Sequence, residues 1–103
     1  MKTTLTDTIY TDPGHGWVKV PLARLNKLGI LNKITTYSYI RNDHAYLEED
    51  CDFSTYITAL KAVGITPKFK EKHTNKYSKI RSYRHYSPSL ATELIRITKE
   101  FDL

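Results

Sequence analysis

The stretch from Tyr77 to Tyr86 contains the residue types that bind phosphate groups and flat rings. Arginine and lysine form charge-assisted hydrogen bonds to phosphate, and arginine can hold two oxygens at once. Tyrosine rings stack on nucleobases, which contributes about 1–3 kcal/mol per base. A strand would place alternate residues on one face: these are Tyr77, Lys79, Arg81, Tyr83 and His85. The pattern predicts a site for a phosphate-bearing ring system.

Basic residues in the preceding segment extend this predicted site. Lys68, Lys70 and Lys72 alternate there, and Glu71 is the only acid between residues 68 and 84. The ligand-binding residues that we predict are His15, Lys68, Lys70, Tyr77, Lys79, Arg81, Tyr83, Arg84 and His85. The alternative is a strand that is merely rich in tyrosine, with lysines that discourage edge-to-edge aggregation.

The run from Asp12 to Trp17 predicts the tight turn of an opening hairpin. An aspartate before Pro-Gly can accept bonds from backbone N–H groups two residues on, and glycine adopts positive φ without a steric penalty. His15 lies between two glycines, so we expect it to be exposed. Trp17 follows at once and can face either the core or the site.

The sequence gives little support for catalysis. His15, His44, His73 and His85 are isolated, without the fixed spacing of a metal site. Acid–base pairs of Asp12 with His15, or of Glu48 or Glu49 with His44, are conceivable, but turn and cap roles explain these acids equally well. Phosphate-loop and dinucleotide glycine motifs are absent. We therefore predict no catalytic residue, no metal and no cofactor, and favour a protein that is not an enzyme.

Composition indicates a single small basic domain over residues 1–103. The net charge is +5 and the pI about 9.3, which favours phosphate-bearing partners. The only cysteine, Cys51, cannot form an internal disulfide, the first residues predict no signal peptide, and no run of about 20 apolar residues occurs in the sequence. These features predict a cytoplasmic protein without a membrane partner.

Periodicity predicts an α+β fold made of three hairpin–helix units (ββαββαββα), at about residues 5–30, 34–65 and 67–103. Gly29 and Gly64 should end the first two helices, whereas Ser87 and Pro88 should begin the third, with an Arg96–Glu100 pair on its exposed side. Asp50 or Asp52 should cap the second helix. Helices packed on a mainly antiparallel sheet form a two-layer sandwich. The expected core strand residues are Trp17 or Val18, Val20, Ile34, Ile40, Leu47, Phe69 and Ile80.

Asp-Pro-Gly-His-Gly-Trp-Val-Lys-Val, together with Tyr-Leu-Glu-Glu-Asp-Cys-Asp at 46–52, resembles a family of small bacteriophage and mobile-element proteins. The resemblance covers roughly residues 10–65 and transfers no catalytic residue. It implies the cytoplasm of a host cell and a counter-defence or host-takeover role. One such class of protein sequesters a nucleotide signal of the host without cleaving it.

Three functions remain open from the sequence. The first is a non-catalytic protein, either a monomer or a homo-oligomer, that binds a phosphate-bearing nucleotide. The second is a nucleic-acid-binding protein, and the third is a protein-interaction inhibitor of a host factor. For the first, we expect Arg81→Ala to weaken binding more than Lys72→Ala, and to leave the fold intact because Arg81 is predicted to point away from the core.

Overall fold

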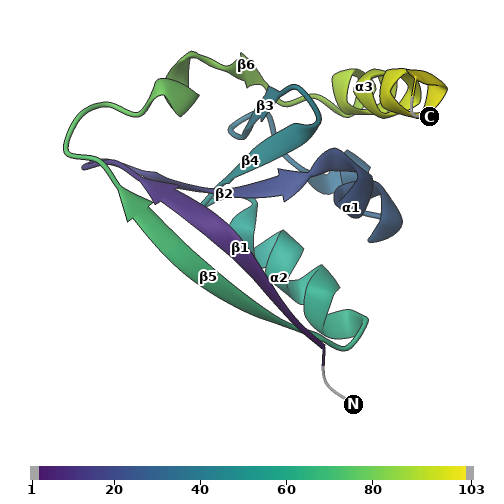
Figure 1. Ribbon diagram of the computed structural model, residues 1–103, viewed down its shortest axis with the longest axis horizontal. Helices are drawn as coiled ribbons and strands as arrows, with labels where there is room; N and C mark the ends of the chain where they lie inside the picture. Colours follow the sequence, from purple (N-terminus) through teal and green to yellow (C-terminus); the bar gives the residue numbers. More distant parts are fainter. Residues whose placement is uncertain (1–2, 102–103) are drawn as a thin grey trace.

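The computed structural model describes residues 3–101, and side chains as far as Lys99. Its strands are β1 (Thr3–Thr11), β2 (Gly16–Pro21), β3 (Tyr39–Arg41), β4 (His44–Glu48), β5 (Ile65–His73) and β6 (Arg84–His85). Its α-helices are α1 (Leu22–Lys27), α2 (Phe53–Ala62) and α3 (Pro88–Phe101), and its 3-10 helices are η1 (Leu31–Lys33) and η2 (Lys79–Ser82). The α+β class is confirmed (Figure 1). The predicted Arg96–Glu100 pair involves a side chain outside the described part.

The six strands form one mixed sheet with the order β5-β1-β2-β4-β3-β6. The first two predicted hairpins are present, because β1 pairs with β2 and β3 with β4, both antiparallel. The third predicted hairpin is wrong: β5 and β6 lie at opposite edges of the sheet, and β5 runs parallel to β1. Helix α2 connects β4 to β5 and allows this parallel return.

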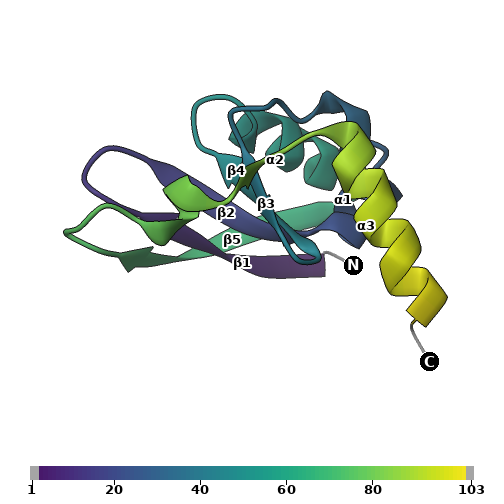
Figure 2. The same cartoon turned by 90° about the horizontal axis from the view of Figure 1, so that it is seen from above.

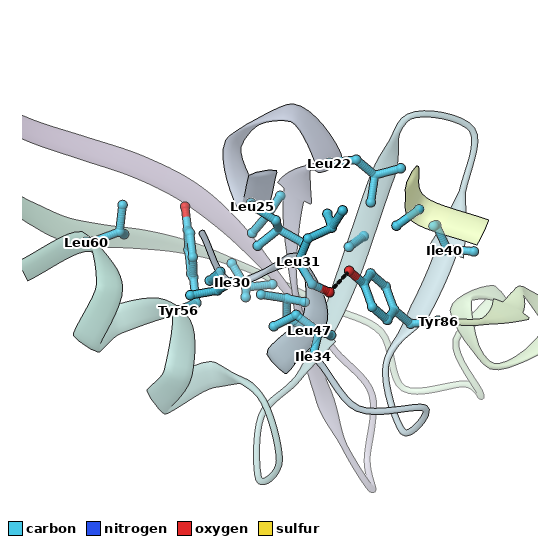
Figure 3. Close-up of a cluster of buried hydrophobic side chains, with 14 residues drawn as sticks. Leu22, Leu25, Ile30, Leu31, Ile34, Ile40, Leu47, Tyr56, Leu60 and Tyr86 are labelled. Carbon is cyan, nitrogen blue, oxygen red and sulfur yellow. Dashed lines mark hydrogen bonds between the residues drawn. The ribbon is translucent and has the colours of Figure 1, made fainter. Parts of the chain in front are cut away.

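Strand alternation divides the apolar side chains between two faces of the sheet. Val18 and Val20 share one core with residues of α1, α2 and α3, and α1 and α2 lie on one side of the sheet (Figure 2). This main core includes Leu22, Leu25, Ile30, Leu31, Ile34, Ile40, Leu47, Tyr56, Leu60 and Tyr86 (Figure 3). The hydroxyl of Tyr86 donates to the carbonyl of Leu31 at 2.5 Å, which satisfies the one polar atom that this ring carries into the core.

A second, smaller cluster lies on the opposite face. Trp17, Tyr46 and Ile80 are buried there, with Tyr10, Tyr39 and Tyr83 packed against them. Ile80 and Tyr83 belong to the segment 74–83, which lies over this cluster and which we call the cover segment. The predicted core residues are therefore mostly buried as expected, but Trp17 and Ile80 belong to this separate cluster and not to the helix-covered core.

Two predicted strands are largely irregular. Residues 34–38 form no strand, and of the stretch 77–86 only Arg84 and His85 are strand, because η2 occupies 79–82. The Ser78 side chain accepts the Ile80 N–H at the start of η2. Such local bonds compete with a sheet ladder, so the tyrosine-rich composition of the stretch does not decide its conformation.

The predicted helix ends agree better with the structure. Gly29 and Gly64 have φ of +73° and +80°, the left-handed conformation that stops a helix. The Ser87 side chain accepts the Leu90 N–H, so Ser87 caps α3 as predicted. Asp52 does precede α2, but its carboxylate makes no capping bond and instead binds the Thr35 N–H and hydroxyl.

Within the described residues, no helix combines the length and apolar character needed to cross a membrane.

Candidate functional site

The buried carboxylate of Asp12 organises the end of the sheet where β1 turns into β2. Its Oδ1 accepts the backbone N–H groups of Gly14 and His15, each at 3.0 Å. This is the side-chain-to-backbone turn that an aspartate before Pro-Gly favours, so the predicted turn is confirmed. The turn leaves the His15 ring about half exposed, with 45% of its side-chain surface accessible.

Arg81 binds the same carboxylate from far along the chain. Its Nε donates to Asp12 Oδ2 at 2.7 Å and its Nη2 donates to Oδ1 at 2.9 Å, while the Ser78 N–H donates to Oδ2 at 3.0 Å. The Arg81 bonds, followed by the backbone N–H groups, hold the pKa of Asp12 far below its ordinary value. The prediction that Arg81 points away from the folded interior is wrong, because its guanidinium is the ion-pair partner of a buried acid.

Three of the predicted ligand-binding residues converge beside this ion pair. His15, Tyr77 and Arg81 line one hollow of about 480 Å³. The guanidinium carbon of Arg81 lies 4.7 Å from the centre of the Tyr77 ring and 5.3 Å from that of Trp17. Tyr77 remains 83% exposed, so its free ring surface is available for stacking.

Tyr83 and Arg84 lie elsewhere, in a hollow that we call the arginine cleft. It has a volume of about 460 Å³ and is lined by Ile40, Arg41, Asn42, Ser82, Tyr83, Arg84, Leu90 and Leu94. The Arg41 guanidinium carbon lies 4.9 Å from the centre of the Tyr83 ring. Sequence reasoning missed Arg41, which is the last residue of β3 and reaches the cleft because β3 pairs with β6.

The remaining predicted residues lie apart from both hollows. Lys68 and Lys70 are exposed on β5, beside Thr6 and Thr8 of β1. Lys79 is exposed on η2. The His85 ring packs 4.9 Å from that of Tyr39, and its Nδ1 lies 2.8 Å from the Thr36 carbonyl oxygen. The predicted set therefore does not form a single site.

A further hollow, which we call the acidic pocket, joins His15 to the loop between β4 and α2. It has a volume of about 260 Å³ and is lined by His15, Trp17, Tyr37, Tyr39, Glu48, Asp50, Cys51 and Arg81. Buried Glu48 is fixed in it, because its Oε2 accepts the N–H groups of Asp50 and Cys51 at 2.8 and 2.9 Å. Its Oε1 lies 3.3 Å from His15 Nδ1.

Cys51 is a poor nucleophile in this surrounding. Desolvation, then a hydrogen bond to Glu48 and the charges of nearby acids, raise the pKa of its thiol. A raised pKa keeps the sulfur protonated at neutral pH, and only the thiolate is strongly nucleophilic.

The acid–base pairs suggested by the sequence are replaced by different ones. His44 pairs with the residue that precedes it in the chain, because Asp43 Oδ1 lies 2.7 Å from His44 Nδ1. Glu48 instead lies beside His15, because β2 pairs with β4 and places Trp17 opposite Glu48. Knowledge that β2 pairs with β4 would have predicted this contact. The spacing of the residues in the sequence does not specify that pairing.

No family model, curated protein or solved structure matches this chain. The arginine cleft, the exposed lysines of β5 and the acidic pocket are therefore the features from which a function can be inferred.

Proposed function

We propose that this protein binds a phosphate-bearing nucleotide in the arginine cleft and does so without catalysis. The observation that carries the proposal is the pair of guanidinium groups of Arg41 and Arg84. Neither forms an ion pair with an acid among the residues that the structure describes. By contrast, the Arg24 and Arg81 guanidinium groups are both engaged by buried aspartates.

The cleft combines the features that a nucleotide requires. Guanidinium groups form forked hydrogen bonds to phosphate oxygens, and Ser82 and Asn42 add polar groups at the rim. Ile40, Leu90 and Leu94 supply an apolar wall for a ring. A volume of about 460 Å³ falls within the range of small-molecule sites.

We also propose a sequestering role in the cytoplasm of a host cell, which is the role that the resemblance of residues 10–65 to small phage proteins leads us to expect. A sponge for a nucleotide signal needs a tight site but no catalytic groups. On this proposal the protein lowers the free concentration of its ligand and releases it unchanged.

Calorimetry with cyclic nucleotides and ADP-ribose derivatives tests this proposal. Arg84→Ala should weaken binding at least about tenfold, because one charge-assisted contact is lost. Lys61→Ala removes one exposed positive charge from α2, outside the cleft, and should leave the affinity unchanged. The proposal fails if the folded protein binds none of these ligands more tightly than high-micromolar, or if Arg84→Ala binds as the unmodified protein does.

A second candidate function, nucleic-acid binding, is favoured by the sheet face beside β5. The parallel register places Lys68 beside Thr6, Lys70 beside Thr8 and Lys72 beside Tyr10. The three lysines are exposed, share one face by strand alternation, and form a basic row suited to a phosphate backbone.

Salt dependence distinguishes this second function from the first. Contacts to several phosphates make the logarithm of the binding constant fall steeply with the logarithm of salt concentration. A gel shift with single- and double-stranded DNA and RNA should therefore weaken with salt, and Lys68→Ala with Lys70→Ala should reduce the slope. If no shift occurs at low salt, this second function is excluded.

A further inference from the structure

We propose that His15, Glu48, Glu49 and Asp50 bind a divalent transition-metal ion at the mouth of the acidic pocket. Each residue offers one nitrogen or oxygen ligand atom, and these atoms all lie within 4.8 Å of one another. The ligands come from two places, the turn between β1 and β2 and the end of β4 with the two residues that follow it. The spacing of these residues in the sequence does not predict that His15 meets the three acids.

Part of the cluster, the Glu48 carboxylate and the Glu49 backbone, is held in place without an ion. Glu48 is only 7% exposed, and the backbone N–H groups that bind its Oε2 leave Oε1 facing His15. The Glu49 N–H donates to the Gly16 carbonyl at 3.0 Å. A Cβ at position 16 would lie 2.9 Å from Glu49 Oε2, so glycine leaves the room that this carboxylate occupies.

The charge of the cluster also favours a cation. Three carboxylates gather here in a chain whose net charge is +5. The Glu49 and Asp50 carboxylates form no hydrogen bond or ion pair with any described residue. Arg81 lines the same pocket, but its charge is already paired with Asp12. A bound cation would relieve the repulsion between the acids.

Trp17 supplies a second observation at this pocket, one that is independent of the carboxylates. Its side chain lines the pocket and is 2% exposed, and its Nε1 is a buried polar atom without a hydrogen-bond partner among the described residues. Native proteins rarely leave a buried donor unpaired. An N–H group cannot bind a cation, but it can donate to an oxygen atom that accompanies one, such as a metal-bound water or oxyanion.

The ligand types indicate which ions should bind. One imidazole with three carboxylates suits Mn²⁺ and Zn²⁺, whereas Mg²⁺ and Ca²⁺ prefer oxygen ligands alone. We therefore expect Mn²⁺ or Zn²⁺ to bind at least about tenfold more tightly than Mg²⁺ or Ca²⁺.

Titration of the tag-free, chelator-treated protein with each ion tests the site. Calorimetry should give one Mn²⁺ or Zn²⁺ per chain, and Mn²⁺ should quench the fluorescence of Trp17, which is the only tryptophan. His15→Ala and Glu49→Gln should each weaken binding at least about tenfold. Circular dichroism and melting temperature verify that both variants are folded.

His44→Ala is the matched control, because His44 also lies beside an aspartate but outside the pocket. It should bind the ion as the unmodified protein does, and so should Arg84→Ala, since the arginine cleft shares no residue with the cluster. The proposal is overturned if no ion binds saturably, if folded His15→Ala keeps its affinity, or if His44→Ala loses as much.

Discussion

At the scale of single residues, the Asp12 carboxylate is the most heavily bonded group at the end of the sheet where β1 turns into β2. Its side chain is fully buried, and Arg81 binds both of its oxygens. Removing one partner of a buried ion pair leaves an uncompensated charge. We therefore expect Arg81→Ala to lower the melting temperature by about 5 °C or more, while Arg84→Ala changes it by less than about 2 °C. Thermal melting followed by circular dichroism measures both, and equal melting temperatures would contradict the structural role of Arg81.

The same carboxylate predicts a loss of stability in acid. Its pKa in the folded protein lies below the ordinary value of 3.8, so the unfolded chain binds this proton more tightly than the folded one. The resulting stabilisation is complete above about pH 5 and is lost as the pH falls through the acid range. Urea unfolding between about pH 2 and pH 7 should show this decline, and Asp12→Asn, less stable at neutral pH, should show a shallower one. An unchanged slope in Asp12→Asn would assign the decline to other acids.

At the scale of elements, Ile80 is the one fully buried side chain of the cover segment. Ile80 is 3% exposed and packs against Trp17 and Tyr46. Ile80→Ala should reduce the free energy of unfolding by about 2–5 kcal/mol, through lost burial and the cavity that remains. It should also shift the Trp17 emission to the red, as water reaches the ring. Lys79→Ala, an exposed neighbour on η2, should do neither. If Ile80→Ala is as stable as the unmodified protein, the segment does not contribute to the fold in this way.

At the scale of the whole molecule, the two apolar clusters share their strands. Val18 and Leu47 belong to the main core, whereas their chain neighbours Trp17 and Tyr46 belong to the smaller one. Losing either strand removes both clusters, so unfolding should be a single cooperative transition. Trp17 fluorescence and far-ultraviolet circular dichroism should give the same urea midpoint. A lower midpoint by fluorescence alone would mean that the cover segment detaches before the sheet unfolds.

The distribution of basic and acidic groups over the surface is also a property of the whole molecule. The basic row on β5, the arginine cleft and the acidic pocket lie on different parts of one sheet and its loops. A chain with a net charge of +5 can thus attract phosphates on some surfaces and a cation on another. Net charge alone indicates only the first of these.

The sequence by itself determined the features that depend on neighbours a few residues away. The turn at residues 12–16 follows from the side chain of Asp12 bonding its own turn. The helix ends at Gly29 and Gly64 follow from the freedom of glycine to take positive φ. The α+β class and most of the buried positions follow from period and alternation. These interactions are short in sequence, so residue types and spacing are sufficient to predict them.

Only the tertiary structure decided which distant segments meet. Nothing local distinguishes β1 from β6 as the partner of β5, because any strand edge offers the same backbone groups. The bonds of Asp12 to Ser78 and Arg81 span 66 and 69 residues. They help to hold residues 79–82 as a 3-10 helix, where the sequence predicts a strand. The meeting of His15 with Glu48 likewise depends on the pairing of β2 with β4. Long-range pairing is selected by the packing of the whole chain, which the spacing of residues does not encode.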